Sequence, residues 1–290
     1  MGRIVKEIAM SVLGEEALKN VWGRVEIIGD IAVLRKSPKT DIKILKALAE
    51  ELLRRLPYVR SVWAAISPVS GTFRTREYVH LAGEKRTLTT YKEHGCVFKV
   101  DIAKTYISPT LNYEHIRVAR LVRDDEFVIN MFAGVGTFSI IIAKQSRPSK
   151  VVSIDINPYA YELMRENVYL NKVDDIVEPV LGEAGEVIER YYEAADRVLM
   201  PLPELAYRYL PKALKALKGR GFIHVYDFVS AKNRAEAVRK AREKYLACLS
   251  MTAVHADIAY ARVVRSVGPH YYQVVLDIDV KEVGALVKTT

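Results

Sequence analysis

The stretch "NMFAGVGTF" (residues 130–138) joins the end of one apolar run to two glycines and the start of another apolar run. The preceding "EFVINMF" (126–132) is typical of a buried strand, and the following "TFSIIIAKQ" (137–145) is typical of a buried helix. Glycines at a strand-to-helix turn let the backbone pass close beneath a nucleotide-like ligand. The stretch therefore predicts the ligand-binding turn of an α/β domain.

Strand-like and helix-like segments alternate from about residue 111 onward, which predicts a mostly parallel sheet with helices on both faces. The ending differs, because two extended runs, 249–264 and 270–279, meet around "SVGPH" with no helix between them. We expect these runs to pair as an antiparallel hairpin at the sheet edge. The fold class is therefore α/β and Rossmann-like. Strand-rich segments between 61 and 107 predict a smaller α+β domain, so we place one domain at 1–107 and a second at 108–290.

The chain has 290 residues and a formal net charge of +9, which makes a polyanionic partner plausible. Two cysteines without metal-ligand spacing indicate structural thiols, and nothing in the sequence suggests a metal site. No apolar run has the length of a membrane span, and charges occupy the N-terminal segment where a signal peptide would be apolar. We therefore expect a cytoplasmic protein.

Carboxylates follow the next two strands of the alternation. Asp155 ends the second strand in "SIDINP", and Glu183 follows the third in "VLGEAGE". Ligands of doubly wound sheets lie outside the carboxyl ends of the strands, where a carboxylate accepts hydrogen bonds from ribose hydroxyls. We expect Asp155 to do this and Glu183 to face the adenine edge. The alternative is that the glycines only form a turn and Asp155 only caps a helix.

Two cofactors, NAD and S-adenosylmethionine, compete for this arrangement. The dinucleotide fingerprint requires a third glycine, but the series here is Gly134, Gly136 and Ser139. The predicted C-terminal hairpin also fits a methyltransferase better than a dehydrogenase. The sequence therefore favours S-adenosylmethionine.

Four longer stretches extend the pattern: "MFAGVGTFSIIIAK" (131–144), "SIDINPYAYELMRENVYLNKV" (153–173), "AGEKRTLTTYKEHGCVFKVDIAKTYISP" (82–109) and "DRVLMPLPELAYRYLPKAL" (196–214). Together they resemble the archaeal and eukaryotic tRNA guanine-37 N1-methyltransferases and their wyosine-pathway relatives. The resemblance runs from about residue 20 to the end. It implies a class I methyltransferase domain behind a smaller domain, acting beside the anticodon of tRNA.

Residue roles follow from this resemblance. Methylation at guanine N1 needs a base for the N1 proton and a donor for the charge that gathers on O6. The resemblance implies Glu114, in "SPTLNYEHIR", as the base and Arg74, in "GTFRTRE", as the stabilising donor. The residues implied at the cofactor are Tyr106, Phe132, Gly134, Gly136, Asp155, Ile156, Asn157 and Glu183. Pro201 and Pro203 are implied on the substrate side.

Three residues depart from the family pattern. Thr110 replaces an arginine, and Asn130 replaces the aspartate that opens the glycine motif. Pro201 stands where the family has an asparagine that orients the target guanine, and a proline offers no amide side chain. The target is therefore either guanine N1 or, at the same tRNA position, carbon 7 of a tricyclic wyosine precursor.

Other functions stay open at this stage. A sister branch transfers an aminocarboxypropyl group and carries the motifs "GIGHLS" and "MGY". This chain has "GVGTFS" and "MPLP" at the corresponding places, which favours methyl transfer. A non-catalytic tRNA-binding protein is a further alternative. We also expect that the sequence before Arg74 is too short for the extra N-terminal domain of some members, and we favour a monomer.

Overall fold

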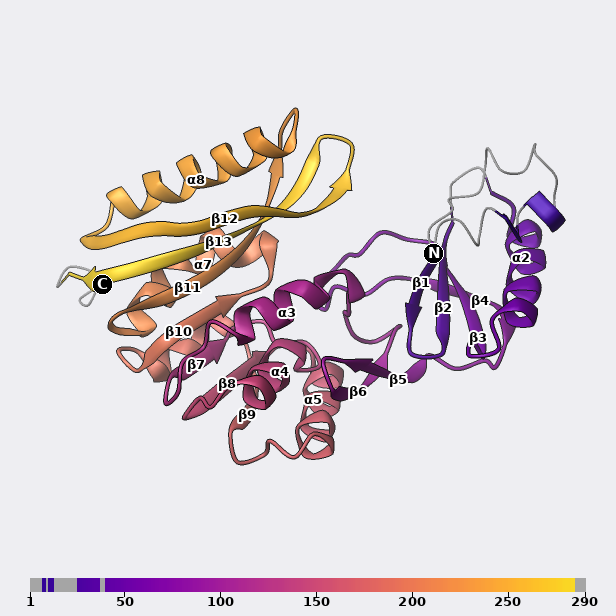
Figure 1. Ribbon diagram of the computed structural model, residues 1–290, viewed down its shortest axis with the longest axis horizontal. Helices are drawn as coiled ribbons and strands as arrows, with labels where there is room; N and C mark the ends of the chain where they lie inside the picture. Colours follow the sequence, from indigo (N-terminus) through magenta and orange to yellow (C-terminus); the bar gives the residue numbers. More distant parts are fainter. Residues whose placement is uncertain (1–6, 9, 13–24, 37–39, 285–290) are drawn as a thin grey trace. The chain divides into compact units, whose positions relative to one another are not determined.

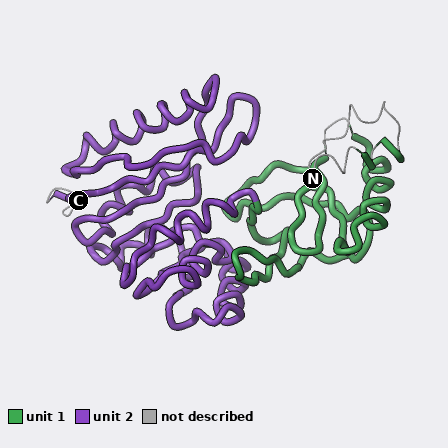
Figure 2. The backbone as a smooth tube through the Cα atoms, in the orientation of Figure 1, with its two compact units in different colours: residues 1–109 green, residues 110–290 purple. Residues whose placement is uncertain are grey.

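The computed structural model describes residues 7–8, 10–12, 25–36 and 40–284. The chain divides into two compact units, unit 1 (Met1–Pro109) and unit 2 (Thr110–Thr290), coloured separately in Figure 2. Each unit has its own sheet and core and is considered by itself below. Among the described helices, none is both long and apolar enough to cross a membrane.

Unit 1 is built around a four-stranded sheet in the order β1-β2-β3-β4 (Figure 1). The strands are β1 (Val25–Ile28), β2 (Ile31–Arg35), β3 (Ser61–Ala65) and β4 (Tyr78–Gly83). Helix α2 (Ile42–Arg55) connects the parallel pair β2 and β3, and its leucines at helical spacing, Leu45, Leu48 and Leu52, pack on the sheet. Its first turn is capped by the Asp41 side chain, which accepts from the Lys43 amide. A separate hairpin, β5 (Leu88–Glu93) with β6 (Cys96–Asp101), follows.

Unit 2 is a seven-stranded sheet in the order β12-β13-β11-β10-β7-β8-β9. Strands β11, β10, β7, β8 and β9 are mutually parallel. Strand β13 pairs antiparallel with β11, and β12 pairs antiparallel with β13 at the edge of the sheet. The strands are β7 (Phe127–Asn130), β8 (Lys150–Asp155), β9 (Val177–Leu181), β10 (Ala195–Met200), β11 (Leu217–Ser230), β12 (Val254–Gly268) and β13 (Tyr271–Val283). The predicted α/β class is confirmed, with the antiparallel hairpin at the edge.

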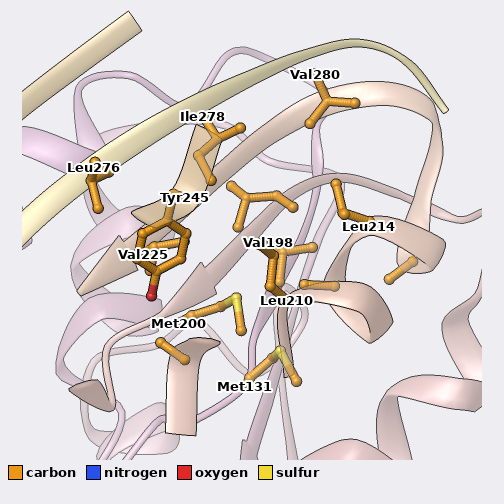
Figure 3. Close-up of a cluster of buried hydrophobic side chains, with 14 of the residues drawn as sticks. Met131, Val198, Met200, Leu210, Leu214, Val225, Tyr245, Leu276, Ile278 and Val280 are labelled. Carbon is orange, nitrogen blue, oxygen red and sulfur yellow. The ribbon is translucent and has the colours of Figure 1, made fainter. Parts of the chain in front are cut away.

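The helices of unit 2 cover both faces of the sheet. They are η1 (Pro109–Leu111), α3 (Asn112–Ala119), α4 (Thr137–Gln145), α5 (Pro158–Leu170), α6 (Ala184–Val187), η2 (Ile188–Tyr191), α7 (Pro203–Ala216) and α8 (Arg234–Ser250). Figure 3 shows one core face, where Val198, Val225 and Ile278 of the sheet meet Leu210 and Leu214 of α7 and Tyr245 of α8. Because strand side chains alternate, His224 and Tyr226 point to the opposite face, where α3 and α4 pack.

The C-terminal hairpin begins later than the sequence suggests. Residues 249–250, expected in the first extended run, are the last residues of α8, and β12 starts at Val254. Helix α8 lies along the hairpin, and Figure 1 shows it beside β12. Its end is ambiguous from sequence because "LACLSMTAV" has neither glycine nor proline to stop a helix.

Candidate active site

The candidate site lies where the order of the sheet changes direction. Strand β7, the first of the sheet, is flanked by β8 on one side and by β10 on the other. The segments that leave the carboxyl ends of β7 and β10 are the glycine turn (residues 131–136) and the proline loop (residues 201–203). Ligands of open α/β sheets bind at such a switch point, so the topology marks these two segments.

Both glycines of the glycine turn adopt left-handed backbone angles, with φ of 58° at Gly134 and 91° at Gly136. The Gly134 amide donates to Asp155 Oδ2 at 2.6 Å, and the Asn157 amide donates to Asp155 Oδ1 at 2.9 Å. Burial raises the pKa of Asp155, and these two backbone hydrogen bonds oppose the rise. A carboxylate has about four acceptor sites, so Asp155 has capacity for further donors besides the two amides that hold the turn.

The Asn130 side chain both donates and accepts a hydrogen bond, whereas an ionised aspartate only accepts. Its Nδ2 donates to Ser139 Oγ at 3.1 Å, and its Oδ1 accepts from the Phe132 amide at 3.4 Å. The side chain therefore ties the end of β7 to α4 and to the glycine turn. Asn130 and Ser139, which both depart from patterns discussed above, are thus joined by a side-chain hydrogen bond.

The adenine side of the expected cofactor site carries exposed apolar side chains. Ile156 is 40% exposed directly after Asp155, and Leu181 is 47% exposed opposite it in the β8–β9 register. Asn157 caps α5 by accepting from the Tyr159 amide at 3.0 Å. Phe132 is half-buried and lies 5.9 Å from the Tyr209 ring between centroids. These features fit a flat, apolar ligand face at the carboxyl ends of β8 and β9.

Glu183 caps α6 through the Glu186 amide at 3.0 Å and accepts the Tyr209 hydroxyl at 2.5 Å. Burial opposes ionisation of Glu183, but the Tyr209 hydrogen bond and two backbone amides hold its pKa below the usual value. Burial and the Glu183 carboxylate raise the pKa of Tyr209 to about 12. Tyr209 therefore stays a proton donor, a partner of Glu183 that the sequence did not reveal.

The proline loop enters α7 without a side-chain cap. Pro203 is buried at the first helical position, where its missing amide costs no hydrogen bond, and the Leu202 carbonyl accepts from the Ala206 amide at 3.0 Å. Pro201 is half-buried. The loop is thus shaped by backbone contacts, with no amide side chain at position 201.

Glu114 lies in the first turn of α3 and is fully buried. Its Oε2 accepts from Arg117 Nε at 3.0 Å and from the Tyr226 hydroxyl at 2.9 Å. Its Oε1 accepts two bonds from Arg262 of β12, one from Nε at 2.9 Å and one from a terminal guanidinium nitrogen. The predicted base is therefore a buried carboxylate held by three side chains from three elements.

A buried polar chain continues from Glu114 across the sheet. Arg117 also pairs with Asp277 of β13 at 2.6 Å, and His224 Nδ1 lies 2.7 Å from Asp277. His224 Nε2 lies 2.7 Å from an Arg197 nitrogen, and Arg197 pairs with Glu126. Because a guanidinium only donates, His224 Nε2 must accept, so the ring is neutral and its Nδ1 donates to Asp277.

The pKa shifts agree with this assignment. Burial lowers the pKa of His224, although the hydrogen bond to Asp277 opposes the shift. Burial alone would raise the pKa of Asp277, but His224 and Arg117 hold it far below its usual range. This series of buried polar side chains was not predicted from the sequence. Its signal is the alternation in "GFIHVYDFV", where a strand buried on both faces carries a histidine and a tyrosine on one of them.

Thr110 is also contacted by β12. Arg265 donates to Thr110 Oγ1 at 2.6 Å and to Gln273 Oε1 at 2.7 Å. At position 110 the family pattern has an arginine. In this chain a threonine stands there, and the guanidinium of Arg265 from β12 lies beside it.

Arg74 and Tyr106 belong to unit 1. Arg74 lies in the loop between β3 and β4, has a left-handed φ of 55°, and its guanidinium carbon is 5.3 Å from the centroid of the Tyr106 ring. An isolated bridge between Ser70 and Thr75 closes the loop. A left-handed arginine is strained, and such strain is common at functional sites. The two residues predicted from the resemblance are therefore brought together within this unit.

Two family models match most of the chain. Residues 89–253 match the TRM5/TYW2 methyltransferase domain, and residues 5–87 match the TYW2 N-terminal domain. The first match contains the glycine turn, Asp155, Glu183, Glu114 and the proline loop. The resemblance stated from the motifs is confirmed.

Curated relatives agree with these matches. The chain is 44% identical over 262 residues to the tRNA 4-demethylwyosine(37)-methyltransferase Taw21 of Saccharolobus solfataricus, covering 90% of this chain and 95% of the relative. It is 37% identical to the tRNA (guanine(37)-N(1))-methyltransferase Trm5b of Methanocaldococcus jannaschii, covering 89% and 71%. It is 35% identical to an aminocarboxypropyltransferase acting on tRNA(Phe) 4-demethylwyosine(37) in the same organism, covering 71% and 78%.

Solved structures have the same fold. A complex of aTrm5 with tRNALeu superposes with a TM-score of 0.81 at 34% identity, covering 96% of this chain and 78% of the other. The structure of Pyrococcus horikoshii TYW2 with MeSAdo superposes with a TM-score of 0.76 at 28% identity, covering 97% and 99%. The expected class I methyltransferase fold is therefore confirmed.

Proposed function

The chain belongs to the TRM5/TYW2 methyltransferase family, and from this premise we propose that it transfers a methyl group from S-adenosylmethionine to the purine at position 37 of tRNA. The observation that carries the proposal is the 44% identity to Taw21 across 90% of the chain, together with a glycine turn and Asp155 at the switch point. A relative in complex with tRNALeu supports tRNA as the partner.

The residues at the carboxyl edge fit S-adenosylmethionine. Gly134 and Gly136 leave the backbone of the turn without side chains, and Asp155 has acceptor sites for the ribose hydroxyls. Ile156 supplies an apolar surface for adenine, and Glu183 supplies an acceptor for its edge. When bound, the cofactor provides an electrophilic methyl group and takes up the electron pair of the broken carbon–sulfur bond.

We assign Glu114 as the base and Arg74 as the electrostatic stabiliser. At guanine N1, Glu114 takes the N1 proton, and the electron pair of that nitrogen–hydrogen bond becomes available to the methyl carbon. At carbon 7 of the tricyclic base, a π electron pair of the ring attacks the methyl carbon first, and Glu114 then removes the C7 proton, which returns its electron pair to the ring. Arg74 stabilises the negative charge that gathers on the purine oxygen. Tyr106, whose ring lies under Arg74, orients the guanidinium. The remaining contribution of the protein is positioning.

The proline at position 201 bears on the target. An asparagine amide there would bond to the guanine edge, and Pro201 offers no such group. The relative Taw21 is named as a methyltransferase of 4-demethylwyosine, whereas the relative Trm5b is named as a methyltransferase of guanine N1. We propose that the chain methylates N1 of guanine and also C7 of the tricyclic 4-demethylwyosine base. A protein restricted to the tricyclic base is the second candidate, and Pro201 is the observation that favours it.

A methyl-transfer assay with labelled S-adenosylmethionine tests these proposals. It uses two matched tRNAs, one with unmodified guanine at position 37 and one with 4-demethylwyosine, followed by nucleoside mass analysis. Label on both supports the double function, and label on the tricyclic base alone supports the second candidate. A mass increase of about 101 Da instead of about 14 Da would mean aminocarboxypropyl transfer and would overturn methyl transfer. Cofactor binding without turnover on either tRNA would mean a non-catalytic binding protein.

We further propose that the chain acts as a monomer in the cytoplasm. Neither of the two described cysteines, Cys96 and Cys248, is in a disulfide, as expected in a reducing compartment. Unit 1 and unit 2 each carry one of the two assigned groups, Arg74 and Glu114, so both units are required for activity. We assign unit 1 to the side of the RNA target loop and unit 2 to the cofactor.

A further inference from the structure

Glu114 has no acceptor site left for a substrate proton in this arrangement. A carboxylate has about four acceptor sites. Two donors, Arg117 Nε and the Tyr226 hydroxyl, bond to Oε2. Two more, both from Arg262, bond to Oε1. A base must offer a lone pair to the proton that it removes, so at least one donor has to leave before Glu114 acts.

The three side chains differ in how easily they leave. Tyr226 is fully buried, and Arg117 is 11% exposed and also bonded to Asp277. The Arg262 side chain is 32% exposed and rests on Tyr113, with its guanidinium carbon 4.3 Å from the ring centroid. Arg262 therefore has an open path to solvent and an aromatic face to rest on, whereas the other two donors are fixed in the core.

We propose that Arg262 is a positioning residue that holds and orients the Glu114 carboxylate before catalysis and releases Oε1 to the target purine. This inference rests on the proposed role of Glu114. The charged and titratable groups that face Glu114 are Arg117 of α3, Tyr226 of β11 and Arg262 of β12, with Asp277 of β13 behind Arg117. Arg262 is the cation whose removal leaves the Arg117–Asp277 pair intact.

The test is the pH dependence of single-turnover methyl transfer at saturating cofactor and limiting tRNA, where the acid limb reports the enzyme before Arg262 leaves Glu114. Removing a neighbouring cation favours the protonated carboxyl, so R262Q moves the acid limb of the profile to higher pH. R262K keeps the charge and leaves the limb near its wild-type position. R265Q is the matched control, since Arg265 lies on the same strand and bonds to Thr110 and Gln273. An acid limb that R262Q leaves in place, or that R265Q moves equally, overturns the proposal.

A second readout needs no substrate. Glutamate side chains labelled with ¹³C at the carboxyl carbon report their protonation by NMR, and the Glu114 signal is the one missing from E114Q. Its titration midpoint moves upward in R262Q and stays in place in R265Q if Arg262 holds the carboxylate. Wild-type turnover by E114Q would refute the assigned base and remove the catalytic meaning of Arg262. An unmoved midpoint in R262Q would refute the Arg262 inference alone.

Discussion

At the scale of single residues, Glu114 shows how a fully buried carboxylate is stabilised beside a parallel sheet. An unpaired buried charge costs several kcal/mol, and here two guanidinium groups and a hydroxyl satisfy it. Burial and, next, the Glu114 charge raise the pKa of Tyr226 well above its ordinary value, so Tyr226 remains a donor. The same contacts that stabilise the fold therefore fix the orientation of the carboxylate that we propose as the base.

Replacing Glu114 by glutamine tests whether this carboxylate is the base. E114Q keeps the size of the side chain and removes its basicity, so we expect turnover to fall by about 10²- to 10⁴-fold. Affinity for S-adenosylmethionine, measured by equilibrium binding, should stay close to wild type because the glycine turn is untouched. Urea unfolding provides the control for stability. A single-turnover rate within about twofold of wild type would exclude Glu114 as the general base.

At the scale of elements, the glycine turn depends on a backbone conformation that other residues rarely adopt. A Cβ added at Gly136, where φ is 91°, would lie 3.0 Å from Met164 Cγ and 3.1 Å from Ile140 Cδ1. We expect G136A to lose about 1 to 3 kcal/mol of unfolding free energy and to bind S-adenosylmethionine more weakly. G95A is the control, because Gly95 has a φ of 78° but open space around it. G95A should lose stability and keep cofactor affinity, and wild-type cofactor affinity in G136A would contradict the role of the turn.

The elements themselves were largely predictable. Period and turn residues gave α4 at its observed bounds, and the missing third glycine together with the C-terminal hairpin indicated the cofactor class. Two partners of Glu114 were not predictable, because Tyr226 and Arg262 come from strands more than a hundred residues away. The local sequence pattern predicts which side chains of one strand share a face. The register of β11 with β13 and of β13 with β12 decides which residues of different strands lie side by side on that face.

The buried chain on this sheet face makes stability depend on pH. His224 has a lowered pKa in the folded state, so the unfolded chain binds the extra proton below about pH 6.5 and stability falls as the pH decreases. We expect His224 to contribute up to about 1.4 kcal/mol of lost stability per pH unit below that value. Asp277, also lowered, adds a further loss below about pH 4.

Replacement of His224 by glutamine separates the contribution of His224 to the pH dependence of stability from that of Asp277. A glutamine carbonyl accepts from Arg197 and its amide donates to Asp277, so H224Q retains both contacts without a titrating group. Urea unfolding at about pH 7 and pH 5 should show a smaller stability difference for H224Q than for wild type. Equal differences in the two proteins would mean that other histidines cause the acid sensitivity.

At the scale of the whole molecule, the two residues that we propose for catalysis belong to different units. Unit 2 has the sheet, the glycine turn and Glu114, and unit 1 has Arg74 on its strained loop. The general fold and the likeness to a tRNA-modifying family were visible in the motifs. The charge balance of +9 was not informative alone, since many basic proteins bind no nucleic acid. With tRNA as the proposed partner, the contribution of this positive charge to binding can be tested.

The net charge of +9 predicts that tRNA binding depends strongly on salt. Each phosphate neutralised by a lysine or arginine releases counterions, which adds about 0.7 to 0.9 to the slope of log affinity against log salt. With about three such contacts, affinity for tRNA falls more than tenfold between about 50 and 200 mM salt. The contacts that we propose for S-adenosylmethionine are to its ribose and adenine and do not neutralise phosphates, so its affinity, measured under the same conditions, should change little and serves as the control. Salt-independent tRNA binding would mean that the positive charge of the chain is not used on the RNA backbone and that base and shape contacts alone select the substrate.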